Sequence, residues 1–557
     1  MKRNLFNVKV LGGMLVSAAV ALASCSDDLQ EGNLAGSGDN TPAKAKLTTA
    51  TLAVSQSNQA RVRAIEAEGE DESVAEAVAP GTLQLIAEIE NPSKEEGFME
   101  VEGRFLSATC VYYDASTETF YTTYHMQGNN YNTTQEVETA GMIETFKLDT
   151  EGQPVLEEIY RSANPEKLDF DFNHLYFDDL SDWTNCGLYK GTDTGVRFIA
   201  VGHSSEPTKD GTGYNTKAII AKLNLEEGKI EYSPVLTGEK LLDEEGKSLG
   251  DIDAGDVNCV LRKYDYYYLA TRKGIAVLNA KPENLFTPIN NLGEDFHPVE
   301  NSTYFVKTPG SAKHFSHIWG NGSHFSLLYL TENTPAGFDG TTALPASIIN
   351  FSMNAGDGTL CGSTTTDSQT DGKAIFNTTD FDITTWSPNV NQSAIPYMIY
   401  PVDGKNVLAT PSYGRTYACL GKSGLYVKKT GNSMDGPYAD DQIVTFRDKK
   451  DVSSSRSVNG VYIEDIESHS NGYIYVANGA CVTILEATSL KKIAEYSAFE
   501  EGKEVSANYV HVVKTDNYTN PNSPDRIVTV AYGQDGVKVF RFTPVTWNDE
   551  EWNYWAN

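Results

Sequence analysis

The sequence is short of cysteine, methionine and positive charge. Its 557 residues include 7 Cys, 8 Met and 44 Lys and Arg, against 76 Asp and Glu, which gives a formal net charge of −32. Proteins that bind nucleic acid need a basic face to release counterions, and docking on anionic lipid headgroups needs the same sign of charge. The composition therefore argues against both partners. A well-solvated surface explains the acidity most simply, and attraction of a cation or a cationic ligand is the alternative.

Motifs of the common enzyme classes are absent too. The sequence has no G-x-S-x-G elbow, H-E-x-x-H motif, Walker loop, Rossmann fingerprint or EF-hand loop. Residues 251–256 alternate carboxylates like the start of a calcium loop, but the glutamate expected at position 12 is missing, so we interpret them as a turn. With 76 acidic residues, no pair can be singled out for glycoside hydrolysis. The sequence thus predicts no catalytic residue, no metal site and no cofactor.

The cysteines after residue 25 are scattered, with no C-x-x-C and no zinc spacing. They are Cys110, Cys186, Cys259, Cys361, Cys419 and Cys481. All but Cys186 and Cys361 stand in apolar stretches typical of strands. We interpret these as buried free thiols that pack as small hydrophobic groups. A disulfide is the alternative, because an oxidising compartment would permit one.

What the sequence does contain is the composition of strands and turns, with 30 Tyr, 22 Phe and 46 Gly. The clearest example is Arg526–Phe542, which reads RIVTVAYGQDGVKVFRF. An apolar run meets a turn with Gly533, Asp535 and Gly536, and a second run then largely alternates its apolar residues. Because glycine tolerates positive φ, this stretch predicts a β-hairpin.

The same hairpin pattern occurs three more times, at 266–278 (YYYLATRKGIAVL), 416–427 (TYACLGKSGLYV) and 473–485 (YIYVANGACVTIL). Each has a strand, a glycine, an apolar residue at +1 and valine at +3. The structural turn glycines are Gly274, Gly424, Gly479 and Gly536, and their intervals of 150, 55 and 57 residues fit a unit of about 50. Such a period, built from strands, is typical of β-propeller blades. We predict an all-β fold, a β-propeller over residues 81–543, with seven blades as the first choice and six or eight as alternatives.

Other stretches predict the remaining strands and loops. A strand at 82–89 could complete the last blade from the N-terminal side, which would close the ring and remove an open sheet edge. Further strands are expected at 108–126, 142–148, 155–160, 196–201, 218–223, 324–330 and 347–351, and long loops at 127–140, 203–216 and 331–345. Residues 332–396 leave room for an eighth blade. The tail 544–557 has three Trp and is expected to pack on the propeller.

The hairpins resemble LVIVD-type and related β-propeller repeats found in bacterial surface proteins. In that family a strand ends in a small residue, a turn with glycine follows, and the next strand is rich in Val and Ile. Residues 531–539 (AYGQDGVKV) match best, and the resemblance covers about residues 103–543. It implies a β-propeller whose matched residues are structural, so no chemistry is carried over with it.

Residues 1–24 have the features of a signal peptide, with a basic start and an apolar stretch at 8–23 that is too short for a membrane span. Residues 22–25 (LASC) resemble the lipobox of bacterial lipoproteins. The resemblance implies cleavage before Cys25 and acylation of its thiol, palmitate included, and several acyl chains give stable anchoring. Residues 26–28 (SDD) resemble the surface-export signal of Bacteroidetes lipoproteins. We expect a lipid-anchored outer-membrane protein exposed at the cell surface, with a secretory signal and an incidental Cys as the alternative.

Residues 25–80 are low in large apolar side chains and rich in Ala, Ser, Thr, Gly and Glu, and 66–76 (EAEGEDESVAE) is strongly acidic. Such a composition buries too little apolar area to order a chain. We predict a flexible, disordered tether that lifts the propeller off the membrane.

Histidines and aromatic residues in the predicted loops form the candidate ligand-binding set. Its members are His125, Tyr131, Trp183, His203, His317 and Trp319. Aromatic faces with a few polar groups suit a small molecule or a glycan. His314, His317 and His324 could also surround a metal, but local hydrogen bonding in a polar loop is the simpler interpretation. Packing between blades is the alternative for the aromatic side chains.

Together these features predict a non-catalytic binding protein at the outer membrane. It would capture a nutrient, such as a glycan, a cofactor or a metal chelate, for a partner transporter. A rigid propeller on a tether presents its loops to the medium, and insertions in neighbouring blades can build one pocket. An adhesin or protein-binding scaffold with a flat face is the first alternative. A propeller hydrolase or lyase, with carboxylates or histidines converging at a channel mouth, is the second.

Overall fold

The computed structural model of the chain describes a series of strand segments and some of the turns between them. The described residues are 48–65, 81–92, 104–114, 117–128, 142–162, 171–177, 198–207, 214–234, 240–242, 248–251, 257–263, 266–271, 274–279, 304–307, 312–321, 324–331, 346–353, 360–362, 382–386, 399–402, 415–419, 424–428, 442–447, 456–464, 473–486, 490–499, 505–514 and 525–544. Apart from the short 3-10 helix η1 (Gln59–Arg61), every described helix or strand element is a β-strand. The described part of the chain is all-β, as the composition predicts.

The first large sheet joins two antiparallel meanders through β1 (Thr48–Gln56), in the order β4-β5-β6-β7-β1-β11-β10-β9-β8. The first meander consists of β4 (Arg104–Asp114), β5 (Thr119–Gly128), β6 (Met142–Leu148) and β7 (Pro154–Ser162). The second consists of β8 (Asp171–Phe177), β9 (Phe198–Pro207), β10 (Tyr214–Asn224) and β11 (Lys229–Pro234). Each meander has the four-stranded form of a propeller blade.

The sheets that follow along the chain repeat this antiparallel order. A small pair comes first, β12 (Lys240–Leu242) with β13 (Ser248–Asp251), and then the sheet of β14 (Val257–Lys263), β15 (Tyr266–Thr271), β16 (Gly274–Asn279) and β17 (Tyr304–Lys307). The next sheet consists of β18 (Ala312–Asn321), β19 (His324–Thr331), β20 (Ala346–Met353), β21 (Leu360–Gly362) and β22 (Asp382–Trp386). Two further sheets consist of β23 (Ile399–Val402), β24 (Arg415–Cys419), β25 (Leu425–Lys428) and β26 (Gln442–Val444), and of β27 (Val458–Ile463), β28 (Tyr473–Asn478), β29 (Cys481–Glu486) and β30 (Lys492–Ser497).

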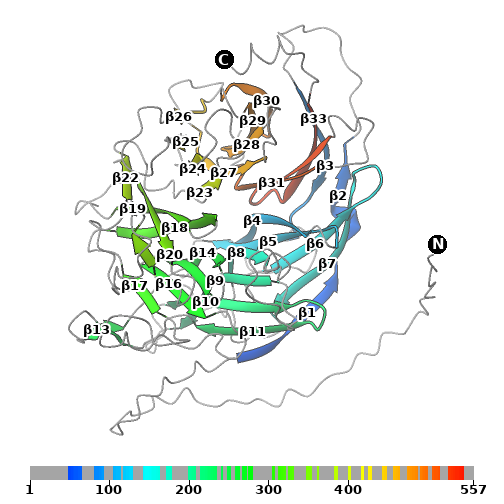
Figure 1. Cartoon of the computed structure of the whole chain (residues 1–557). Helices are drawn as coiled ribbons and strands as arrows, with labels where there is room; N and C mark the ends of the chain where they lie inside the picture. The colour runs from blue at the N-terminus through cyan, green and yellow to red at the C-terminus, as the bar shows by residue number, and fades with distance from the viewer. Residues whose placement is uncertain are drawn as a thin grey trace, which may run out of the picture. The chain divides into compact units, whose positions relative to one another are not determined.

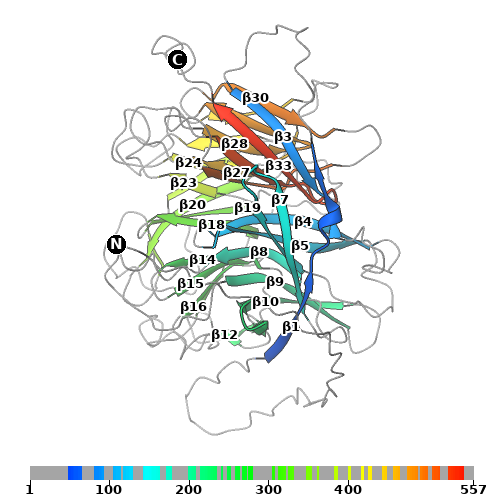
Figure 2. The same cartoon turned by 90° about the vertical axis from the view of Figure 1, so that its right-hand side faces the viewer.

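The last sheet is completed by strands from the N-terminal part of the chain. Its order is β2-β3-β33-β32-β31, with β31 (Tyr509–Lys514), β32 (Arg526–Ala531), β33 (Val537–Pro544), β3 (Gly81–Ile89) and β2 (Val62–Ala64). Figures 1 and 2 both show β3 running beside β33, and their register extends from Gly81↔Pro544 to Ile89↔Val537. This pairing confirms the strand predicted at 82–89 and its place in the last blade. Successive four-stranded meanders, the last closed by an N-terminal strand, give a β-propeller topology. The blade count of seven stays a prediction.

Residues 48–65 do not follow the prediction of a disordered tether over 25–80. β1 pairs antiparallel with β11 through Thr48–Thr51 and with β7 through Leu52–Gln56. After η1, β2 pairs with the end of β3. Backbone hydrogen bonds to existing sheet edges order this stretch although its composition is poor in large apolar side chains. The signal peptide, Cys25 and the rest of the predicted tether lie outside the described residues.

Two predicted loops are in large part strands. The stretch 203–216, expected as a loop, continues β9 and β10 as a hairpin whose register extends to Pro207↔Tyr214. The stretch around His314 and His317 lies in β18 and pairs with β19 through two register shifts. Gly, Ser and Thr favoured the prediction of loops at these places. Pairing between the two arms of each hairpin overrides that local preference.

All four predicted glycine hairpins are present, as β15–β16, β24–β25, β28–β29 and β32–β33. Gly536 has a φ of 83°, and a Cβ there would lie 2.2 Å from the carbonyl oxygen of Ile89, so the turn requires glycine. Gly479 (φ 53°) stands directly after β28, as Gly533 (φ 56°) follows closely after β32. The prediction equated Gly479 with Gly536. The shorter β28–β29 turn instead makes Gly479 the counterpart of Gly533.

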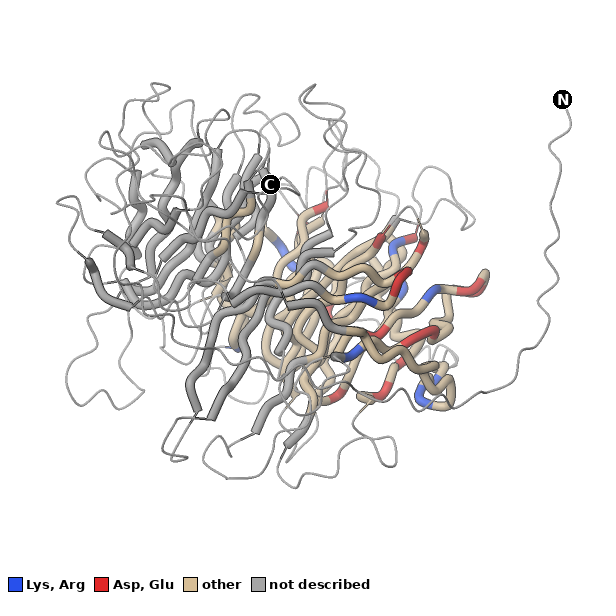
Figure 3. Tube along the Cα trace, turned by 90° about the horizontal axis from the view of Figure 1, so that it is seen from below, with Lys and Arg blue, Asp and Glu red and all other residues tan. Residues whose placement is uncertain are grey.

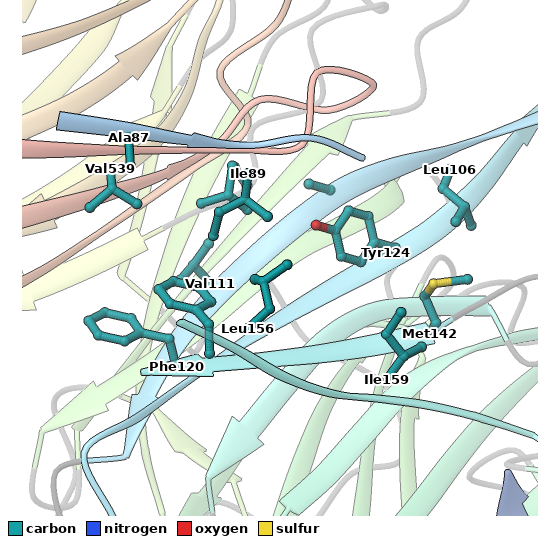
Figure 4. Close-up of a cluster of buried hydrophobic side chains, with 14 of the residues drawn as sticks. Ala87, Ile89, Leu106, Val111, Phe120, Tyr124, Met142, Leu156, Ile159 and Val539 are labelled. Carbon is teal, nitrogen blue, oxygen red and sulfur yellow. The ribbon is translucent and has the colours of Figure 1, made fainter. Parts of the chain in front are cut away.

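The apolar core lies between the faces of neighbouring sheets. One cluster joins β3 and β33 to the first meander, and Figure 4 shows Ala87, Ile89 and Val539 on one side with Val111, Phe120 and Leu156 on the other. The Phe120 and Phe146 rings stack there with centroids 4.7 Å apart. A second cluster joins β28 and β29 to β31–β33, and a third joins β24 and β25 to β27–β29. Burial of these branched and aromatic side chains is the main source of stability for such sheets.

Three described cysteines are buried free thiols, which confirms that interpretation for Cys110, Cys419 and Cys481. Burial raises the pKa of the Cys419 thiol well above its usual range. That thiol therefore stays protonated and packs as a small apolar group.

Candidate functional site

The same six-residue pattern overlaps each of the edge strands β27, β31 and β4. It reads SVNGVY at 457–462, SANYVH at 506–511 and SATCVY at 107–112. Each of these strands is the first of its meander, and the strand order places each at a sheet edge. The pattern therefore supplies equivalent positions, numbered here one to six, in three sheets.

Positions one and three form a hydrogen-bonded connection between sheets. The Ser457 hydroxyl donates to Oδ1 of Asn459 at 2.8 Å. The Asn459 amide then donates from Nδ2 to the carbonyl oxygen of Ala507 at 2.9 Å. The serine fixes the orientation of the amide, and the amide ties the start of β27 to the start of β31. We call this arrangement an asparagine latch.

A second asparagine latch lies one sheet further along. The Ser506 hydroxyl donates to Oδ1 of Asn508 at 3.0 Å, and Nδ2 of Asn508 donates to the carbonyl oxygen of Ala108 at 3.0 Å. In β4 the third position is Thr109, whose hydroxyl pairs with the Thr123 hydroxyl at 2.8 Å instead. The latch therefore connects β27 to β31 and β31 to β4. On β4 itself, the side chain at position three makes a contact within its own sheet instead.

Backbone groups of the glycine turns reinforce both connections. The Ala507 N–H donates to the carbonyl oxygen of Gly479 at 2.6 Å, and the Ala108 N–H donates to that of Gly533 at 2.9 Å. At Gly460, position four of β27, a Cβ would lie 2.9 Å from the Asn508 carbonyl oxygen. The strands β27 and β31 thus approach one another closely enough to require a glycine at that contact.

Position six places aromatic rings on the three edge strands next to one another. The His511 ring centroid is 5.2 Å from that of Tyr462 at an interplanar angle of 70°, and 6.0 Å from that of Tyr112. Tyr113, the next residue of β4, lies 6.4 Å from His511. Such tilted and edge-to-face arrangements are favourable for ring quadrupoles. We call Tyr462, His511, Tyr112 and Tyr113 the aromatic track.

The aromatic track is uncharged near neutral pH. Burial lowers the pKa of His511 to about 4, so the imidazole is neutral at pH 7. Burial, with the nearby charges of Glu118 and Asp114, raises the pKa of Tyr113 above its usual range. The track therefore presents polar edges without a formal charge.

A buried ion pair stands beside the aromatic track, between β27 and β32. Arg526 donates to both carboxylate oxygens of Glu464, from Nη2 at 2.6 Å and from Nε at 3.2 Å. The Tyr475 hydroxyl donates to the same carboxylate at 2.8 Å. Burial alone would lower the pKa of Arg526, but the hydrogen bonds and charge of Glu464 raise it. The group is charged, satisfied and enclosed, which suits a structural connection between two sheets.

A second buried ion pair attaches the N-terminal segment to the first meander. Arg61 binds the Glu144 carboxylate of β6, Ser57 donates to the same carboxylate, and the Tyr124 hydroxyl donates to it at 3.3 Å. Arg61 and Glu144 are both buried. Figure 3 shows acidic and basic residues interspersed along the described strands. In both ion pairs an arginine and a tyrosine share one carboxylate.

The predicted ligand-binding residues fall on three strands, β5, β9 and β18, or outside the described residues. Tyr131 and Trp183 lie outside them. The register places His125 of β5 opposite Ser107, His203 of β9 opposite Asp171 and Ala218, His317 of β18 opposite Leu328 and Trp319 of β18 opposite Ser326. His125 thus lies beside position one of the repeated pattern, and the other three lie in strands of other meanders.

The aromatic track is missing from the sequence-based prediction, which concentrated on loops. Its signal was present as the repeat of Ser, Asn or Thr, Val and an aromatic ring at 457, 506 and 107. The glycine hairpins lie in the inner strands of their sheets, whereas this pattern lies in the edge strands. The hairpins therefore did not reveal it. No helix among the described residues has the length and apolarity to cross a bilayer.

No protein-family model matches the chain, and no curated protein matches it. Among solved structures it is similar to the β-propeller domain of Cps50 (Swd1) from Myceliophteria thermophila, at 11% identity over 79% of this chain and 96% of that one, with a TM-score of 0.36. BBS1N in complex with ARL6DN matches at 9% identity over 79% and 94%, with a TM-score of 0.37. A protein of unknown function from Bacteroides caccae matches at 12% identity over 56% and 78%, with a TM-score of 0.29. The fold assignment itself depends on the sheet order described above.

Proposed function

We propose that the protein is a surface lipoprotein of the outer membrane whose β-propeller binds a ligand without catalysis. Cys25 carries the acyl chains, palmitate among them, and residues 26–28 direct the protein to the cell surface. The ligand is a nutrient, namely a glycan, an organic cofactor or a metal chelate, and a partner transporter receives it.

The pairing of β3 with β33 is the observation that carries this proposal. It joins the N-terminal part of the chain to the last sheet, so an anchor at Cys25 would hold the whole propeller. The 22 residues from 26 to 47 separate Cys25 from β1. A segment of that length spans at most about 75 Å, which is enough to hold a propeller clear of the headgroups.

The described buried charges support a scaffold. The Glu464 and Glu144 carboxylates are occupied by arginine and hydroxyl partners that connect separate parts of the fold. A general acid or base would instead need to reach a substrate. These carboxylates hold sheets and segments together, and binding is left to the surface of the rigid scaffold.

Acylation is the first test. The full chain, expressed in a Bacteroidetes host with an alkyne-bearing palmitate analogue, should become labelled and fractionate with the outer membrane. Cys25→Ala should abolish the label, whereas Cys481→Ser, which changes a buried thiol, should keep it. Labelling that survives in Cys25→Ala would contradict the anchor.

Surface exposure and partnership form the second test. Protease added to intact cells should cleave the wild-type protein, and Asp27→Ala with Asp28→Ala should protect it by retaining it on the inner side. Mild detergent extraction followed by affinity purification should recover an outer-membrane transporter. Recovery of no transporter from cells that carry labelled, surface-exposed protein would rule out the transport role.

A further inference from the structure

The repeated pattern of the three edge strands separates packing from exposure. Position five is valine in all three strands, and Val461, Val510 and Val111 are 1%, 0% and 0% exposed. They belong to the core clusters between the sheets. Because successive side chains of a strand point to opposite faces, position six lies on the other face. The valine at position five therefore packs in the apolar core on one face of each strand.

Position six is different in both chemistry and burial. Tyr462, His511 and Tyr112 each keep part of their surface accessible, and none is aliphatic. Aromatic side chains such as Tyr473, Tyr475 and Phe540 also fill the core between sheets, but those rings are fully buried. Three consecutive edge strands therefore place amphipathic rings at partly accessible positions, and Tyr462 also packs against the apolar cluster of β28, β29 and β31–β33.

The geometry of the rings makes them a continuous surface. Tyr462 of β27 contacts His511 of β31, with 5.2 Å between the ring centroids. His511 in turn contacts Tyr112 and Tyr113 of β4, at 6.0 Å and 6.4 Å. The asparagine latches and the glycine-turn hydrogen bonds fix the three strands relative to one another. The rings are thus held in place before any ligand arrives, which reduces the entropy lost on binding.

The chemistry of the track selects among ligands. Neutral rings offer flat apolar faces with hydroxyl and imidazole groups at their edges, which matches a sugar ring that has an apolar face and hydroxyl groups around it. A formal net charge of −32 repels anions. The neutral state of His511 offers no cation to pair with a carboxylate or sulfate.

We propose that the aromatic track is a binding surface for uncharged saccharides, with the sugar stacked on Tyr462 and Tyr112 and hydrogen-bonded by His511. This inference rests on the proposed function and names the ligand class of its binding step. Stacking on one ring contributes about 0.5–1.5 kcal/mol, so loss of one ring weakens binding about twofold to twelvefold.

The experiment is a calorimetric titration of the full chain, purified in detergent, with uncharged glucose-, galactose- and mannose-based oligosaccharides. Uronic-acid and sulfated oligosaccharides serve as charged probes. Tyr462→Leu and Tyr112→Leu should each weaken binding by the expected factor, and Tyr462→Phe should retain most of it. Tyr496→Leu is the matched control, because its ring packs on Phe540, which is not a member of the track, and it should bind as wild type does. Thermal melts show whether each variant is folded.

The other results decide separately on the inference and on the proposed function. Uncharged saccharide bound equally by Tyr462→Leu and Tyr112→Leu would place the sugar elsewhere and leave the proposed function standing. Binding of charged oligosaccharides alone would refute the ligand class. If no saccharide binds while Cys25 is acylated and a transporter co-purifies, the track is not a saccharide site although the lipoprotein role holds. If uncharged saccharide binds at the track but Cys25 is not acylated, the saccharide site stands and the lipoprotein role is refuted.

Discussion

The junction between the β27–β30 sheet and the β31–β33 sheet can be compared with the junction between residues 57–61 and the first meander. Both have a buried glutamate at the centre, Glu464 in one and Glu144 in the other. In both, an arginine and a tyrosine bind the carboxylate. The chemistry is the same, but the surroundings differ.

The first junction lies in an extensive apolar core. Aromatic and branched side chains of β28, β29 and β31–β33 form one buried cluster beside Glu464, and an asparagine latch supports it. The second junction is held mainly by backbone pairing of β1, where Leu52 is buried in the core. A buried glutamate bound by an arginine and a tyrosine can therefore connect two sheets of the propeller or attach an additional segment. Which of the two it does depends on the apolar area around it.

Removal of Arg526 should have the largest effect on the free energy of unfolding. Arg526→Met leaves the Glu464 carboxylate buried without its cation, which costs about 3–5 kcal/mol. Because the site lies in the core between two sheets, unfolding should stay cooperative with a lower denaturant midpoint. Guanidinium titration followed by circular dichroism measures this. Lys147→Met, which removes an exposed partner of Glu157, is the control and should change stability by less than about 1 kcal/mol.

Removal of Arg61 should act locally. Arg61→Met also strands a buried carboxylate, but detachment of residues 48–65 lets water reach Glu144 while the meander persists. Hydrogen exchange should therefore accelerate in β1 and η1, with global stability reduced by about 1–3 kcal/mol. Exchange that accelerates equally in β28 and β32 would show that the N-terminal segment is integral to the fold, and the two junctions would no longer differ.

Acid should weaken the first junction through His511. Burial lowers the folded pKa of His511 to about 4, whereas an unfolded histidine has a pKa of about 6.5. The unfolded chain binds the proton more tightly, so this contribution to stability is complete above pH 6.5 and is lost as the pH falls towards 4. The rings that face His511 are those of Tyr112, Tyr113 and Tyr462, and none gains or loses a proton in that range.

Thermal melts between pH 7 and pH 4 measure this contribution, which amounts to about 1–3 kcal/mol. The variant His511→Tyr introduces the residue type that stands at the equivalent position of β27 and β4. It should lose the part of the acid sensitivity that wild type shows above pH 4. Identical pH profiles for the two proteins would mean that the imidazole is already solvated in the folded chain.

The sequence predicted the strands well where the pattern is local. The four glycine hairpins and the strand at 82–89 are present because alternating apolar residues and turn glycines act over a few positions. Residues 48–56 were missed because their order comes from two sheet edges distant in sequence. The hairpin arms at 203–207 and 214–216 were missed for the same reason, since Ser and Thr fit both loops and strands.

The candidate site could be predicted less well. Sequence reasoning looked for histidines and tryptophans in loops, where binding residues concentrate. The aromatic track lies on strands, and its members are about 50 residues apart or at opposite ends of the chain. Only the pairing of β3 with β33, together with the contacts of β31 with β27 and β4, brings Tyr112 to His511.

Substitutions in the asparagine latches should have the smallest effect on stability, because each removes hydrogen bonds of one side chain and leaves the apolar core intact. Asn459→Ala removes the amide that reaches Ala507 at the first junction, and Asn508→Ala removes the one that reaches Ala108. Each leaves a buried or half-buried carbonyl without that donor, at a cost of about 1–2 kcal/mol. The Ala507 and Ala108 N–H groups stay bonded to the turn glycines, so the strands should remain in place.

The two latches share Ser506, whose hydroxyl accepts from Nδ2 of Asn459 at 3.2 Å and donates to Oδ1 of Asn508, so the costs of the two substitutions should be coupled and not simply add. Urea titrations of the single and double variants measure this. Ser457→Ala, which only frees the Asn459 amide to rotate, should cost less than Asn459→Ala. A serine effect as large as the asparagine effect would show that the stabilisation lies in the turn within each strand and that the amide adds nothing to the contact between sheets.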